Sequence, residues 1–280
     1  MSESDDGFLD LALTSEEWLR NHFLAKSPER VSQVSDLPLF PSDKVLDLCC
    51  GPGYYCDFFA AMVGPSGHVF GVDKDPTHID VALRRRITSP YRDQMSFEVY
   101  DVKIPRCPEL IGDMPLDVVV MFNALFYFEE QATLLQRYFD LLVPGGRLIV
   151  KDSDFGHFMV SPFETKTRNR VVEAAEHDQS YSFNNFAGRN LFKTMRKLNG
   201  AQVTVRAWPY VAHAPLSDAM KHYISTNLIT LLDQARPQLA EKDIRAWMSL
   251  YDRERLEAHI NSPDFIFVMN EMVVIAEKSR

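Results

Sequence analysis

The chain has 280 residues, enough for one large domain or for one domain with a modest cap. Its 46% hydrophobic and 25% charged residues are typical of a globular protein. The formal net charge of −9 argues against a general nucleic-acid-binding protein, which would carry a basic face.

No apolar stretch reaches the ~20 residues that a membrane-spanning helix needs; residues 116–128 come nearest and contain two polar residues. The acidic start of the chain lacks the features of a secretory signal. Cys49, Cys50, Cys56 and Cys107 have neither CxxC spacing nor a His partner at zinc spacing. We therefore expect a cytoplasmic protein with reduced thiols, with no membrane partner and no bound metal.

In chain order, a Thr-Ser-Glu-Glu start predicts a helix over residues 16–25. From residue 44 onward, short apolar runs alternate with helix-like stretches. The expected strands cover residues 44–48, 68–72, 97–100, 117–122 and 147–151, and the expected helices cover 56–62, 76–86 and 131–142. This alternation predicts a doubly wound α/β sheet.

After residue 152 the pattern loosens, and residues 155–185 are rich in aromatic residues, His and Asn without a clean period. We expect a helix over 188–198, a strand over 201–207, helices over 217–235 and 241–259, and either one bent or two short strands over 265–277.

The glycine-containing loop after the first strand is the main candidate for ligand binding. Gly51 and Gly53 have no Cβ, so the backbone can turn sharply and a ligand can approach it closely. Asp73 ends the next strand, where a carboxylate can accept hydrogen bonds from two ribose hydroxyls. These features predict a nucleoside ligand. A dinucleotide-binding loop has a third small residue, usually glycine, three positions after Gly53. This chain has Cys56 there, and the bulky Tyr54 and Tyr55 stand between; this mismatch argues against NAD.

Residues 45–154 resemble the class I S-adenosylmethionine-dependent methyltransferases. The family's first motif is apolar-Asp-x-Gly-x-Gly-x-Gly, and this chain has Asp47, then Cys49 where the first Gly is usual, then Gly51 and Gly53. The form Asp-Leu-Cys-Cys-Gly is similar to the small-molecule, type 11 and quinone-biosynthesis branch. LVPGGRL before the fifth strand and GRNLFKTMRKLNGAQVTV leading into a sixth strand are further shared features.

The resemblance implies a Rossmann-like, seven-stranded methyltransferase sheet with helical cap insertions. It also implies the cofactor S-adenosyl-L-methionine and the product S-adenosyl-L-homocysteine. Asp73 would bind the ribose, Asp101 the adenine amino group, and Asn123 would stand beside the sulfonium. The implied cofactor-binding set is Asp47, Cys49, Gly51, Gly53, Asp73, Lys74, Asp101, Val102 and Asn123.

Structural roles for the same residues remain open. Asp47 could cap the next helix, and Asp101 could be a turn residue. Cys49 and Cys50 are better explained as small packing residues than as a redox pair, because adjacent cysteines bridge only with strain. Asn123 fits a structural role as well as a site.

Methyl transfer mainly requires alignment of the acceptor and exclusion of water, although an alcohol or carbon acceptor also loses a proton. We expect His157 and Asp154 to act in catalysis, in a loop after the fifth strand on the same edge as the cofactor loop. Either residue could equally serve the surface or local hydrogen bonding. Metal binding by His177 and Asp178 has no diagnostic spacing.

The expected domain organisation separates a cofactor core from acceptor-side elements. It comprises an N-terminal helical lid (1–40), the core (41–154), a substrate-side insertion (155–187), a core continuation (188–215), a helical cap (216–261) and C-terminal core strands (262–280). The expected substrate-binding residues are Trp18, His22, Phe23 and Tyr127.

The Asn/Asp-Pro-Pro-Tyr/Phe signature of amino methylation is absent, since the corresponding stretch is FNALFYF. This absence and the acidic charge favour a small organic acceptor over nucleic acid. A nicotinamide-dependent oxidoreductase and a cofactor-binding protein without methyl transfer are the alternatives. Whether carbon, nitrogen or oxygen is methylated stays open, as does a homodimer.

Overall fold

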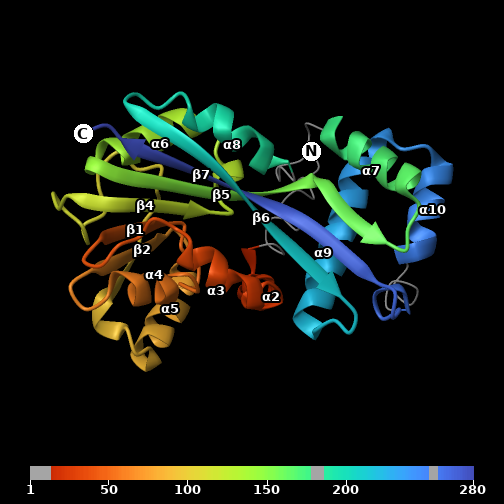
Figure 1. Ribbon diagram of the computed structural model, residues 1–280, viewed down its shortest axis with the longest axis horizontal. Coiled ribbons are helices and arrows are strands. Elements are labelled where there is room, and N and C mark those ends of the chain that lie inside the picture. The colour runs from red at the N-terminus through yellow and green to blue at the C-terminus, as the bar shows by residue number, and fades with distance from the viewer. Residues whose placement is uncertain (1–13, 178–185, 252–257) are drawn as a thin grey trace, which may run out of the picture. The chain divides into compact units, whose positions relative to one another are not determined.

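The structure is a computed structural model that describes residues 14–177, 186–251 and 258–280 (Figure 1). Its described residues form two compact units. The core unit contains Pro28–Asp152, Gly188–Ala207 and Met272–Arg280, and the cap unit contains the described parts of Met1–Ser27, Ser153–Ala187 and Trp208–Glu271. Each unit is treated below by itself.

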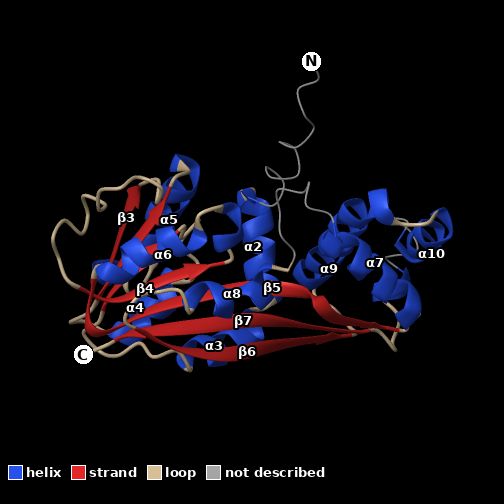
Figure 2. Ribbon diagram, turned by 90° about the horizontal axis from the view of Figure 1, so that it is seen from above, coloured by secondary structure: helices blue, strands red, loops and turns tan. Residues whose placement is uncertain are grey.

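One seven-stranded sheet has the strand order β3-β2-β1-β4-β5-β7-β6. Its strands are β1 (Lys44–Leu48), β2 (His68–Asp73), β3 (Met95–Val99), β4 (Leu116–Phe122), β5 (Leu142–Ser161), β6 (Ala201–His213) and β7 (Ile266–Lys278). The first five strands pair in parallel, and Figure 2 shows β5, β7 and β6 side by side. The predicted doubly wound, Rossmann-like sheet is confirmed.

Helices lie between and around the strands, and some of them begin at a capping residue. They are α2 (Glu16–Ala25), α3 (Ser27–Ser35), α4 (Cys56–Val63), α5 (Pro76–Thr88), α6 (Gln131–Asp140), α7 (Thr165–His177), α8 (Ala187–Met195), α9 (Asp218–Ala235) and α10 (Glu241–Tyr251). Ser15 accepts a hydrogen bond from the Trp18 backbone N–H at the start of α2. Asp75 caps α5 in the same way, with Pro76 in the first turn.

Strands β1 and β4 form the centre of the core unit, which explains their nearly continuous apolar sequences. Every residue of β1 after Lys44 is buried, and so is every residue of β4 except Asp117. The parallel register pairs Leu48 with Val72 on one side and with Met121 on the other. The carboxyl ends of β1, β2 and β4 therefore meet at one edge of the sheet.

The structure corrects the expectation for the segment after residue 151. Strand β5 continues to Ser161, so residues 152–157 are strand and not the predicted loop. Asp154 and Phe155 are both buried in succession, which breaks the period-two alternation that would have indicated a strand. Helix α7 lies in the stretch that showed no clean period, and the C-terminal segment is the single strand β7. Within the described residues, no helix is both long enough and apolar enough to cross a bilayer.

Candidate functional site

The loop after β1 has the backbone conformation that its motif predicts. Cys49, Gly51 and Gly53 all have positive φ angles, of 57°, 53° and 73°. Cys49 thus adopts the left-handed conformation for which glycine is usual at this position, and this costs on the order of 1–2 kcal/mol. The Cys50 backbone N–H donates to the carbonyl of Val72 over 3.0 Å, which ties the loop to the end of β2.

Asp73 connects the end of β2 to the same loop. Its Oδ2 accepts a hydrogen bond of 2.9 Å from the Gly51 backbone N–H, and its Oδ1 accepts one of 2.9 Å from the Asp75 N–H. The Nδ1 atom of His78 lies 3.5 Å from Oδ1. Asp73 is 8% exposed, so its carboxylate is held in a defined orientation with acceptor capacity remaining on both oxygens. His78 was not among the predicted site residues, although its place in the first turn of α5, close after Asp73, was a signal.

Asp47 lies in β1, just before the loop, and is 4% exposed. Burial is the main cause that raises its pKa from 3.8 to about 7, a hydrogen bond from the Cys56 thiol opposes the shift, and the nearby Asp73 charge adds to it. The Cys56 Sγ lies 3.3 Å from Asp47 Oδ2. Asp47 does not cap the next helix, because Tyr55 occupies the position before α4.

Three thiols accompany this carboxyl. Burial raises the pKa of Cys49, and it raises the pKa of Cys50 to about 11. The pKa of Cys56 is also raised, mainly by its hydrogen bond with Cys50. All four cysteines of the chain are free thiols. Protonated thiols are poor nucleophiles, which agrees with packing roles for the partly buried Cys49 and Cys50.

Three more residues of the expected cofactor set lie at the ends of β2 and β3. Asp101 Oδ1 accepts a hydrogen bond of 2.9 Å from the Lys103 backbone N–H, so this residue does form a turn. Val102 is buried, with its carbonyl accepting from the Tyr138 hydroxyl over 3.0 Å, and Lys74 is exposed. Their roles in cofactor binding remain predictions.

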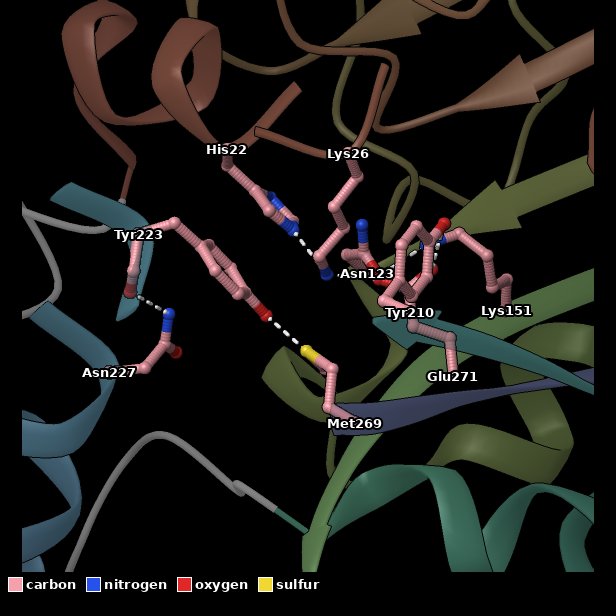
Figure 3. Close-up of polar contacts among 9 residues, drawn as sticks. All are labelled: His22, Lys26, Asn123, Lys151, Tyr210, Tyr223, Asn227, Met269 and Glu271. Carbon is pink, nitrogen blue, oxygen red and sulfur yellow. Dashed lines mark hydrogen bonds and ion pairs between the residues drawn. The ribbon is translucent and has the colours of Figure 1, made fainter. Parts of the chain in front are cut away.

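Asn123 directly follows β4 and is joined to Lys151 twice. Its backbone N–H donates to the Lys151 carbonyl over 2.8 Å, and its side-chain Oδ1 accepts from Lys151 Nζ over 2.8 Å (Figure 3). Asn123 has a φ of 53°, a conformation that asparagine tolerates better than most residues. Lys151 was not among the predicted site residues, although a lysine within a buried strand was a signal.

An aromatic wall lies beside this pair in the core unit. The rings of Tyr55 and Phe122 meet edge to face with centroids 5.0 Å apart. The Lys151 ammonium lies 5.7 Å from the Tyr55 ring centre, and the Arg30 guanidinium lies 4.9 Å from it. Both cations are buried, with 0% and 1% of their surface exposed. Tyr127, an expected substrate residue, packs against the ring of Phe126 in the short helical turn formed by Leu125–Tyr127.

In the cap unit, the structure brings Trp18 and His22 together. Their rings stack at 5.8 Å, and His22 also stacks on Tyr223 at 5.2 Å. Lys26 Nζ lies 3.1 Å from His22 Nε2 and 2.6 Å from Glu271 Oε1 (Figure 3). Phe23 is half-buried, and its carbonyl accepts from the Ser27 hydroxyl, so its part in substrate binding remains a prediction.

Asp154 and His157, the expected catalytic residues, also belong to the cap unit. Asp154 is buried, and its Oδ1 accepts a hydrogen bond of 2.8 Å from the Gly156 N–H. His157 is exposed and lines a surface hollow of about 340 Å³ together with Phe163 and Arg168. These contacts do not assign either residue a catalytic role. Asp178 lies outside the described residues, among which no group of three His, Cys, Asp or Glu side chains could hold a metal ion.

Comparison with known proteins connects this geometry to a family. Residues 39–205, more than half of the chain, match a methyltransferase-domain family model. Demethylmenaquinone methyltransferase of Symbiobacterium thermophilum is 33% identical over 112 residues, which cover 39% of this chain and 42% of that protein. The chain spans less than half the length of the curated relatives it matches.

Two solved structures show the likeness of fold. Phosphoethanolamine N-methyltransferase 2 of Haemonchus contortus, in complex with phosphomonomethylethanolamine and S-adenosylhomocysteine, has a TM-score of 0.55 and 15% identity, covering 100% of this chain and 61% of that one. The YcgJ protein of Bacillus subtilis has a TM-score of 0.52 and 14% identity, covering 89% and 97%. The family match, the sheet order and the loop after β1 agree, and the chain belongs to the class I S-adenosylmethionine-dependent methyltransferases.

Proposed function

We propose that the protein transfers the methyl group of S-adenosyl-L-methionine to a small organic molecule. The observation that carries this proposal is the buried Asp73 carboxylate, which accepts a hydrogen bond from the Gly51 N–H of the loop. Both residues lie within the family-matched core. A carboxylate in this position can accept both ribose hydroxyls of a nucleoside. The loop supports the proposal because its glycines permit close approach of a ligand.

In this function the expected cofactor-binding residues of the core unit have separate tasks. The cofactor supplies an activated methyl group on a positively charged sulfur. Asp47 and the loop backbone would bind its methionine part, Asp101 and Val102 would bind its adenine, and Asn123 would lie near the methyl group. The aromatic wall of Tyr55 and Phe122 would help to exclude water from the acceptor.

The residues predicted from the sequence to bind the substrate are proposed to recognise the methyl acceptor. Trp18 and His22 support it by forming a continuous stack with Tyr223. His157 and Asp154 remain the proposed acid–base residues, and Phe23 and Tyr127 the other proposed substrate contacts. The free thiols support a reducing, cytoplasmic location. A homodimer in solution and a role in biosynthesis complete the proposal.

Isothermal titration with S-adenosylhomocysteine, with NAD as the control ligand, tests the proposed function. We expect micromolar binding of S-adenosylhomocysteine alone. Asp73→Asn should weaken binding by about 1–3 kcal/mol, because it removes a charged acceptor. The matched control is Asp80→Asn on the exposed face of α5, where Asp80 forms an exposed ion pair with Arg84. Binding of NAD alone, or equal affinity in wild type and Asp73→Asn, would contradict the proposal.

A further inference from the structure

The hollow beside His157 is a cavity of the cap unit to which no ligand has been assigned. It has a volume of about 340 Å³, and its lining residues come from the end of β5, the start of α7 and the segment between them. All of these residues belong to the cap unit. Ligand sites in proteins have volumes of roughly 300–1,000 Å³, so this hollow matches a molecule of about one ring in size.

The apolar walls of the hollow are held in place by the buried core of the cap unit. The Phe163 ring meets the ring of Trp247 edge to face with centroids 5.4 Å apart, and Trp247 has no exposed surface. Phe158 is 1% exposed and packs against Phe267 at 5.9 Å. Met159, by contrast, is 48% exposed. Fixed walls lower the entropy cost of binding, and the flexible Met159 side chain can adapt to an apolar ligand.

Three polar side chains line the hollow, and each of them can donate hydrogen bonds. Arg168 uses two of its five N–H groups, because Nη1 donates to the Phe158 carbonyl over 2.8 Å and Nη2 donates to Asn169 Oδ1. Among the described residues, Arg168 has no carboxylate partner. Within the same part of the chain, the side chains of His157 and Thr165 have no hydrogen-bond partner. These donors are therefore available to a ligand.

Charge around the hollow favours a ligand with a single negative charge. Arg168 has the one permanent positive charge among the described residues that line the hollow, and these include no Asp or Glu. Burial lowers the pKa of Arg168, which reflects incomplete hydration of its guanidinium group. The neighbouring Glu164 carboxylate accepts from the Thr167 hydroxyl over 2.7 Å, and the exposed Lys166 offsets its charge. One guanidinium group balances a carboxylate better than a doubly charged phosphate group.

We propose that this hollow binds a small organic carboxylate, with Arg168 holding the carboxylate group and Met159 and Phe163 contacting the apolar part. His157 and Thr165 supply further hydrogen bonds. A charged hydrogen bond to the guanidinium group is stronger than one between neutral groups, so the hollow discriminates between an acid and its neutral amide. The site lies wholly within the cap unit. The inference therefore goes beyond the proposed function and does not require S-adenosylmethionine to bind.

Titration of the 280-residue chain with benzoate, and with benzamide as a neutral ligand of similar shape, tests the site. The titration is made with and without saturating S-adenosylhomocysteine, because a carboxylate could also enter the cofactor loop. We expect benzoate to bind at least about tenfold more tightly than benzamide, with the same affinity in both conditions. Binding of S-adenosylhomocysteine itself tests the proposed function, so the failure of one idea is distinguishable from the failure of the other.

Two pairs of variants connect benzoate binding to the hollow. Arg168→Met should weaken it about tenfold or more, whereas Lys166→Met, at an exposed lysine that does not line the hollow, should change it less than about twofold. Met159→Glu introduces a negative charge at the hollow and should abolish detectable binding, while the neutral Met159→Gln should retain most of it. Because Met159 is exposed, the second pair decides if Arg168→Met fails to fold.

Several results would overturn the inference. One is equal affinity for benzoate and benzamide, or no binding of either compound. Another is loss of benzoate binding when S-adenosylhomocysteine is present, which would place the probe in the cofactor loop. The third is unchanged benzoate binding in folded Arg168→Met or in Met159→Glu.

Discussion

The Lys26 ammonium lies 2.6 Å from Glu271 Oε1, and neither side chain is exposed to solvent. The Tyr210 hydroxyl donates to the other carboxylate oxygen over 3.2 Å, and the ammonium lies over the rings of Tyr210 and Tyr223. These contacts join the residue that follows α2 to strand β7, although the two charges are 245 residues apart. The arrangement anchors the N-terminal helix within the cap unit.

Removal of one of these charges should destabilise the protein strongly. Glu271→Gln leaves the Lys26 ammonium buried without its counter-charge, and we expect a loss of about 3–5 kcal/mol in the free energy of unfolding. The double variant Lys26→Met/Glu271→Gln should lose much less than the sum of the two single variants, because no uncompensated charge remains. Urea denaturation measures all three variants.

The matched control for this pair is the exposed ion pair of Arg245 and Glu241, with 69% of each side chain exposed. Glu241→Gln should change the free energy of unfolding by less than about 1 kcal/mol. Simple additivity of the Lys26 and Glu271 variants would show that the buried charges do not depend on each other.

Gly71 should tolerate no side chain while Phe97 stays in place. A Cβ atom at Gly71 would lie 2.6 Å from Phe97 Cδ1 and 3.0 Å from Cys50 Sγ. Gly71→Ala should therefore cost about 1–3 kcal/mol of stability. In a protein that already carries Phe97→Leu, Gly71→Ala should cost less stability than it does in the wild type. Thermal or urea unfolding of the two single variants and the double variant measures this difference. Independent effects of the two substitutions would place the strain elsewhere.

The raised pKa of Asp47 predicts a pH-dependent stability. Burial raises the folded-state pKa to about 7, so between a pH of about 4 and about 7 the folded protein holds a proton that the unfolded chain has lost. The contribution of Asp47 to stability therefore falls as the pH rises through this window and is constant above it. Urea unfolding at several pH values should show that Asp47→Asn removes this decrease, which amounts to about 4 kcal/mol for a shift of about three pKa units. Parallel curves for wild type and variant would contradict the raised pKa.

The same carboxyl should influence cofactor binding in the proposed function. S-adenosylmethionine is cationic at its sulfur and binds better beside an ionised Asp47. Its affinity should rise by about tenfold from one pH unit below the Asp47 pKa to one unit above it, as calorimetry can measure. Asp47→Asn should show a much flatter pH dependence, and an unchanged slope would assign the effect to a group other than Asp47.

Local sequence patterns predicted the core unit closely. The bounds of β1 agree residue by residue with the predicted strand, and β2, β4, α4 and α5 agree to within two residues at each end. These elements were predictable because strands buried on both faces have continuous apolar sequences, and because glycine and helix-capping residues mark the turns between them. The full length of β5 was not predicted, because its continuation depends on pairing with a strand that is distant in sequence.

By itself the sequence determined the fold class, the loop of Gly51 and Gly53, and the position of Asp73 at the end of its strand. Backbone conformation and strand burial depend mainly on nearby residues, so these features were readable without a structure. Only the tertiary structure decided that Lys151 meets Asn123, that Lys26 meets Glu271, and that Asp47 is buried against a thiol. The partner of a charged side chain, and hence its pKa and the ligand that it favours, depends on which distant segments the fold brings within a few ångströms.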